Sequence, residues 1–122
     1  YNSSGTRQWS RMLGTSEDNY GNGIALDSSN NIYVTGVTED GLDGNTSAGN
    51  DDIFLVKYNA SGTKQWTRQH GTVQNDYGKK IAIDAKGYIY IVADGYGGID
   101  GNTNSGSGDI YLLKYNSSGV KQ

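Results

Sequence analysis

The sequence contains no cysteine and no proline, and only one histidine among its 122 residues. The lack of cysteine excludes a disulfide-stapled scaffold, a thiolate zinc site and a cysteine nucleophile. Apolar runs reach only about four residues, so no segment is expected to insert into a membrane. The net charge of −3 and the absence of a basic run argue against a nucleic-acid partner. The length allows a single domain.

The aliphatic content is also low, and it has to be weighed against the aromatic content. Leu, Ile, Val and Phe make up 22 of the 122 residues, a level at which disorder becomes a reasonable interpretation. However, the chain has ten tyrosines and two tryptophans and carries little net charge, whereas disordered chains have few aromatics and high charge. Its apolar residues also form short clusters separated by turn-forming residues. The chain is therefore expected to fold, with many turns.

An internal repeat of 57 residues organises the chain. The motif Tyr-Asn-Ser-Ser-Gly-Thr at residues 1–6 returns as Tyr-Asn-Ala-Ser-Gly-Thr at 58–63 and begins again at 115. Residues 1–57 align with 58–114 without a gap, and 27 of the 57 pairs are identical. We therefore divide the chain into a first repeat (1–57), a second repeat (58–114) and the start of a third (115–122), as expected for a repeat architecture.

Each repeat is predicted to supply four β-strands. The four stretches are residues 23–27, 31–35, 52–58 and 63–68, of which the last lies just past the boundary between the two repeats, and a long polar loop follows the second strand from 39 to about 50. The fourth strand is the most polar of the four, and residues 6–13 are expected to form its counterpart at the other end of the chain. Helices are not expected, because glycine recurs throughout and no apolar positions follow a helical spacing.

The apolar runs predict how these strands pack. Residues 24–26, 32–34 and 53–56 are apolar without alternation, which indicates sheets covered on both faces. We therefore predict an all-β fold made of β-propeller blades of four antiparallel strands each, with two blades' worth in this chain. Two blades cannot close a ring, so we expect the chain to be part of a larger propeller or of an oligomeric assembly.

The residues of the strands carry a family resemblance. Residues 20–36, with their second copy at 76–92, and the segment Asp-Ile-Phe-Leu-Val-Lys-Tyr-Asn at 52–59 resemble the bacterial SBBP-type β-propeller repeat, and the inner strand pair is similar to NHL-type repeats. The resemblance covers essentially the whole chain. It implies that 23–27 is the innermost strand of a blade and 64–68 the outermost. It also implies a secreted or surface-attached bacterial protein, and no single activity.

The long loops hold the strongest candidate ligands for a metal ion. Both copies place acidic and amide side chains at matching positions: Asp43, Asn45 and Asp52 in the first repeat, and Asp100, Asn102 and Asp109 in the second. Oxygen ligands on a glycine-rich loop suit Ca²⁺, although the spacing is not that of an EF-hand. The alternative is that these residues close Asx turns, with glycine supplying positive φ. The sequence is compatible with both interpretations.

Other polar residues are interpreted mainly as structural. Asp27 and Asp84 each end a strand before a turn, which favours turn closure over a carboxylate facing a central channel. His70 has no thiolate partners and is replaced by Leu13 in the other copy, so it is expected at a surface or blade edge rather than in a metal site.

Aromatic residues offer one further kind of binding site. Three tyrosines occur in one copy only and could stack on a sugar ring: Tyr88, Tyr96 and Tyr111. No catalytic set of residues recurs between the two repeats, so no enzymatic activity is expected.

Two functions fit the sequence. The first is a non-catalytic scaffold or protein-interaction module of an extracellular or cell-surface bacterial protein. The alternative is a lectin-like propeller with one carbohydrate site per blade, which would bind glycans multivalently. The expected partners are other blades of the same protein, or identical chains joined head to tail, with glycans or surface proteins as further candidates.

Overall fold

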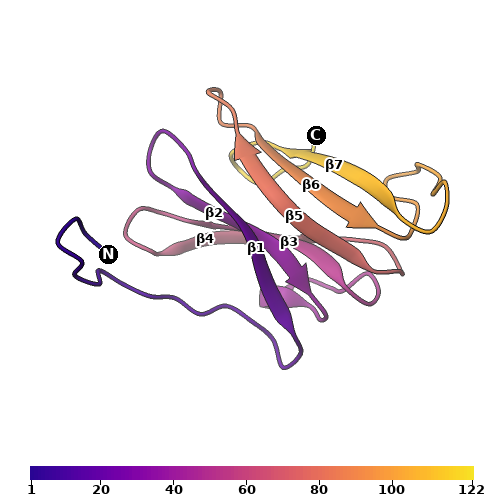
Figure 1. Ribbon diagram of the computed structural model, residues 1–122, viewed down its shortest axis with the longest axis horizontal. Helices are drawn as coiled ribbons and strands as arrows, with labels where there is room; N and C mark the ends of the chain where they lie inside the picture. Colours follow the sequence, from indigo (N-terminus) through magenta and orange to yellow (C-terminus); the bar gives the residue numbers. More distant parts are fainter.

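Seven antiparallel strands form two sheets in the computed structural model, which describes residues 1–122 (Figure 1). In each sheet the strands lie side by side in chain order. The first sheet contains β1 (Asn19–Leu26), β2 (Ile32–Thr38), β3 (Asp52–Tyr58) and β4 (Lys64–His70). The second contains β5 (Asp76–Ile83), β6 (Ile89–Gly95) and β7 (Asp109–Tyr115). The all-β fold of propeller blades is confirmed, and the two sheets do not close a ring.

The strand bounds agree with the sequence in part. The third strand has the predicted limits, 52–58, because its continuous apolar run marks both of its ends. The first strand begins at Asn19 rather than at 23, since its pairing with β2 continues past an irregularity between Gly21 and Gly23. For the same reason β2 extends to Thr38. A single 3₁₀ turn, η1 (Leu42–Gly44), lies in the first long loop.

The strand predicted at residues 6–13 is not formed. The segment runs as an extended chain with no paired strand beside it (Figure 1). A β-strand needs a neighbour to satisfy its backbone groups, and β4, which carries the equivalent residues, has that neighbour in β3. Residues 6–13 have no equivalent of β3 next to them in the structure.

The core lies between the two sheets. Ten buried residues form one cluster to which both sheets contribute, including Ile53 and Leu55 of β3 and Ile89 and Ile91 of β6. On the opposite face of the first sheet, Phe54 and Val56 pack with other buried side chains in a second, smaller cluster. Strand β3 is therefore covered on both faces, as its unbroken apolar run predicts.

The hairpin turn after the first strand of each sheet is closed by an aspartate. Asp27 accepts hydrogen bonds from the backbone N–H groups of Ser29 and Asn31, at 2.9 and 3.0 Å. Asp84 accepts the equivalent bonds in the second sheet. The turn-closing interpretation of both residues is confirmed.

The outer segment of each repeat contacts the turn that begins the following repeat. Trp66 packs over Gly119, and Arg68 Nε donates to Gly119 O at 2.8 Å. Trp9 covers Gly62 in the same way, and Arg11 Nε donates to Gly62 O at 2.7 Å. The 9–11 segment therefore keeps the contacts of an outer strand although it is not paired as one.

The structure has no helix that is long and apolar enough to cross a bilayer.

Candidate functional site

The two long loops share one backbone conformation. Asp43 and Asp100 adopt left-handed φ values of 58° and 54°, and a glycine at φ 81° follows each of them. The next residue closes the turn: Asn45 Nδ2 donates to Leu42 O at 2.7 Å, and its counterpart Asn102 bonds in the same way. Both asparagine amides thus donate to carbonyls of their own loops, whereas an Asx turn would have the side-chain oxygen accept from a backbone N–H two residues on.

Asp43 anchors the first loop to the outer strand β4. Its carboxylate forms an ion pair with Lys64 and accepts a hydrogen bond from Thr67 Oγ1 at 2.7 Å. The hydrogen bond from Lys64, followed by that from Thr67, lowers the pKa of the Asp43 carboxyl below its usual value. Both oxygens of this side chain therefore have donors within the protein.

Asp52 begins β3 and is fully buried. Its Oδ2 accepts from the backbone N–H of Ala48 and from Gln69 Nε2, both at 2.8 Å. Its Oδ1 has no hydrogen-bond partner and lies against Gly71, where a β-carbon would overlap it. The residue therefore ties together the end of the loop, the start of β3 and the outer strand β4.

Asp100 makes a different set of contacts in the second repeat. It pairs with Lys121, and with His70 at 3.2 Å from the outer strand of the first sheet. Desolvation acts to raise the pKa of the Asp100 carboxyl, but Lys121 and His70 outweigh it and lower that pKa. His70 lies on the outer strand, at the edge of its sheet, where the sequence placed it.

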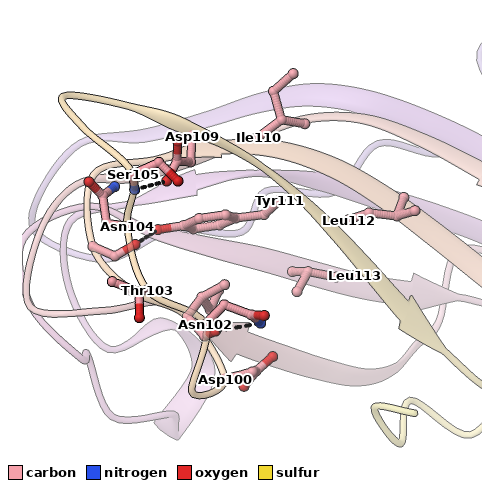
Figure 2. A pocket seen from close by; sticks show the side chains of 13 residues that line it. Asp100, Asn102, Thr103, Asn104, Ser105, Asp109, Ile110, Tyr111, Leu112 and Leu113 are labelled. Carbon is pink, nitrogen blue, oxygen red and sulfur yellow. Dashed lines mark hydrogen bonds between the residues drawn. The ribbon is translucent and has the colours of Figure 1, made fainter.

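The second loop and β7 enclose a pocket of about 450 Å³ (Figure 2). Three of the six residues predicted to bind calcium line it: Asp100, Asn102 and Asp109. Asp109 Oδ2 accepts a hydrogen bond from the backbone N–H of Ser105, drawn dashed in Figure 2. In the first repeat the space between the equivalent loop and β3 is taken by β4, whose side chains bond to Asp43 and Asp52.

The acidic residues do not gather into a dense cluster. No group of three or more histidine, cysteine, aspartate or glutamate side chains is arranged to hold a metal ion. The candidate ligands of the first repeat are bonded to Lys64, Thr67, Gln69 and backbone groups. The calcium interpretation stays a prediction.

The three tyrosines found in one copy occupy unlike environments. Tyr111 is 5% exposed and its hydroxyl donates to Gly97 O, so its ring belongs to the core between the sheets. Tyr88 lies under Lys114, whose Nζ is 4.1 Å from the ring centroid. Tyr96 packs edge-on against Tyr77 with ring centroids 6.2 Å apart. Only Tyr96 of these three presents a largely exposed ring, 49% accessible.

Two residues that matter in this region could not be singled out from the sequence. Gln69 bonds to Asp52 and to the first loop, but Met12 stands at its position in the other copy, so the repeat gives no signal there. Asp76 is fully buried and accepts from the N–H and hydroxyl of Thr72, while Asn19 replaces it in the first copy.

Comparison with known proteins identifies relatives of the chain. The SBBP β-propeller repeat family matches residues 8–42 and 65–109, once in each repeat. The regulatory protein FlaEY of Caulobacter vibrioides is 27% identical over 133 aligned residues. That alignment covers 100% of this chain and 14% of the FlaEY sequence, so the chain spans only a small part of that relative.

Proposed function

We propose that this chain, which belongs to the SBBP family of β-propeller repeats, acts as a non-catalytic scaffold or protein-interaction segment whose partners are further blades of the same kind. These blades belong either to the same longer protein or to identical chains joined head to tail, and the protein acts outside the cell or at its surface. The location is supported by the family resemblance. The choice of partner is supported by the two open faces of the sheet pair.

The single observation that carries the proposal is a difference between equivalent residues of β3 and β7. Ile53 and Leu55 of β3 are each 1% exposed because the second sheet covers them. Their counterparts in β7, Ile110 and Leu112, are 78% and 73% exposed. The same apolar surface that binds a blade in the middle of the chain is therefore open at its end, and such surfaces mark interaction sites.

The opposite face of the sheet pair offers the complementary surface. A mainly apolar groove of about 270 Å³ runs over the first sheet and is lined by residues that include Ile24, Val34, Phe54 and Val56. Trp9 and Leu13 of the N-terminal segment lie along it. In the second sheet the equivalent face is the one that packs on the first sheet. The open face of the first sheet is therefore equivalent to the face by which the second sheet packs on the first. The open face of β7 can pack on it in the same way, which is the condition for head-to-tail stacking.

The contacts of the polar side chains support a non-catalytic role. The only histidine, His70, is in contact with Asp100 and Lys121 at the border of the two sheets. The buried aspartates Asp52 and Asp76 accept hydrogen bonds from neighbouring loops. Each of these side chains has at least one structural partner, although Oδ1 of Asp52 and of Asp76 has none.

Light scattering on the isolated chain tests the proposal. We expect the apparent mass to rise with protein concentration, because the open faces associate. The double variant Ile110→Lys, Leu112→Lys should stay monomeric at the same concentrations, since it places two charges on the face. Val73→Lys is the matched control: Val73 is 72% exposed but lies in the loop before β5, beside Gly49 of the first long loop, rather than on β7. A well-folded parent chain that is monodisperse and monomeric at every concentration would contradict the proposal.

A further inference from the structure

Two buried aspartates lie next to each other where the first sheet meets the second. Asp52 begins β3, Asp76 begins β5, and both side chains are completely buried. Gly71, in the link between β4 and β5, lies against both of them: a β-carbon there would overlap Asp52 Oδ1 and would stand 3.1 Å from Asp76 Oδ2. The backbone N–H of Asp76 also donates to Asp51 O at 2.8 Å. The two carboxylates are therefore neighbours beside a glycine that leaves room for both.

Neither carboxylate has a positively charged partner. The ion pairs of the chain involve other acidic residues, namely Asp43, Asp94 and Asp100. Asp52 Oδ1 and Asp76 Oδ1 are buried without any hydrogen-bond donor. Burying one carboxylate without compensation is costly, and two adjacent carboxylates also repel each other. The pair therefore needs a bound positive charge, which is either a metal cation or a proton.

Further oxygen atoms surround the two carboxylates. Thr72 Oγ1 lies 2.9 Å from Asp76 Oδ2. The Tyr111 hydroxyl donates to Gly97 O (Figure 2), and Gly97 lies against the side chain of Thr72. Burial, followed by the charge of Asp76, raises the pKa of the Tyr111 hydroxyl, as expected for a phenol beside that carboxylate. Two carboxylates, two hydroxyls and one backbone carbonyl thus come together from both sheets and from the links between their strands.

We infer that this cluster binds one calcium ion between the two sheets, with Asp52 and Asp76 as its charged ligands. Ca²⁺ takes about six to eight oxygen ligands of mixed kind in a flexible geometry, and its two charges balance those of the two carboxylates. Thr72 Oγ1, the Tyr111 hydroxyl and Gly97 O are the neutral oxygens of the cluster. Mg²⁺ suits the site less well, because it keeps several of its water molecules and both carboxylates are shut off from solvent.

This site differs from the calcium site that the loop spacing predicts. Of the six predicted loop residues only Asp52 belongs to it, and Asp76 lies outside the long loops. Only two of its ligands are acidic, so it contains no group of three acidic side chains. Since Asp52 belongs to the first sheet and Asp76 to the second, the ion links one blade to the next within the chain. Binding here is independent of the association between open faces in the proposed function.

Calorimetry and thermal unfolding of the intact 122-residue chain at pH 7 test the site. After treatment with EDTA and removal of the chelator, we expect one Ca²⁺ to bind per chain. An ion that binds only the folded state stabilises it, so the melting temperature should rise by about 10 °C at a free Ca²⁺ concentration about one hundred times Kd. Mg²⁺ at the same concentration should raise the melting temperature less.

The variants Asp76→Asn and Asp52→Asn locate the ion. Each removes one charge and keeps the size of the side chain, and the first copy already carries Asn19 at the position of Asp76. Both variants, checked for folding by circular dichroism, should bind Ca²⁺ at least about tenfold more weakly than the parent chain. Asp109→Asn is the matched control, because Asp109 holds the position of Asp52 in the second repeat and belongs to the loop site. It should bind Ca²⁺ as the parent does.

Two results would overturn the inference. Ca²⁺ binding that keeps its affinity in both Asp76→Asn and Asp52→Asn would place the ion elsewhere. A parent chain with the same melting temperature in EDTA, Ca²⁺ and Mg²⁺ would mean that a shared proton, rather than a metal ion, neutralises the pair. Either result would leave the proposed function standing, since self-association through the open faces does not use these residues.

Discussion

Tyr111 and Gly95 show how closely single side chains are matched within a repeat. The Tyr111 ring lies against Gly95, where any β-carbon would overlap it, and its hydroxyl donates to Gly97 O. In the first repeat the same two positions hold Phe54 and Thr38. Tyrosine, the larger side chain, thus occurs with glycine, and phenylalanine occurs with threonine. The two differences between the repeats therefore compensate for each other.

This compensation gives a prediction for a double-mutant cycle. Gly95→Thr should lower the free energy of unfolding by about 1–3 kcal/mol, the usual cost of overpacking. Adding Tyr111→Phe should recover part of the loss, because the hydroxyl no longer fixes the ring and the pair then equals that of the first repeat. Urea denaturation of the single and double variants measures the coupling. Strictly additive losses would contradict the compensation.

The ion pair between Asp43 and Lys64 predicts a pH dependence of stability. Asp43→Asn should lower the free energy of unfolding by about 1 kcal/mol at neutral pH, since it removes the charge that Lys64 and Thr67 bind. The folded state lowers the pKa of Asp43. Its stabilisation is therefore fully present above the unfolded-state pKa of about 3.9, and it is lost as the pH falls through the folded-state value.

Thermal unfolding from pH 7 down to pH 2 checks this dependence. The melting temperatures of the parent chain and of Asp43→Asn should converge as the solution becomes acidic. Glu17→Gln serves as the control, because Glu17 is exposed and its carboxylate has no partner in the structure. A difference between Asp43→Asn and the parent that stays constant across the whole range would show that the ion pair does not stabilise the fold.

The candidate site was only partly predictable at the residue scale. Identity between the repeats marks Asp43, Asp52 and their counterparts, because the repeated loop needs them. Their partners Thr67 and Gln69 lie on β4 and are brought to the loop by strand pairing. Loop spacing carries no information about side chains that arrive from another strand. The residues of the loop could therefore be identified from the sequence, but their hydrogen bonds to the outer strand could not.

At the scale of the element, strand formation depends on the presence of a neighbour as well as on the sequence. The run 53–56 predicts β3 with its correct limits, because a strand covered on both faces is continuously apolar. Residues 6–13 carry a pattern close to that of β4, including Trp9 and Arg11, but no strand lies beside them. Their side chains still hold the 59–62 turn as Trp66 and Arg68 hold the 116–119 turn. The pattern therefore predicts the contacts of an outer strand correctly but not its pairing.

At the scale of the whole molecule, the two sheets share one core and should unfold together. Ile91 of β6 is completely buried in the cluster that also contains Tyr33, Ile53 and Leu55 of the first sheet. Its counterpart Val34 faces the open groove and is only partly buried. The two positions are equivalent in the repeat but differ in whether the other sheet covers them.

Ile91→Ala should therefore lower the free energy of unfolding by about 2–5 kcal/mol, as for other large-to-small changes in a core. Because the cavity would lie between the sheets, protection against amide hydrogen exchange should fall in both sheets, in residues 19–70 as well as in 76–115. Val34→Ala is the matched control and should cost less, since solvent already reaches that face. Loss of protection confined to residues 76–115 in Ile91→Ala would mean that each sheet folds independently. Loss in both would mean that one blade stabilises the next through the shared core, and that each further blade added at Ile110 and Leu112 would stabilise this one in the same way.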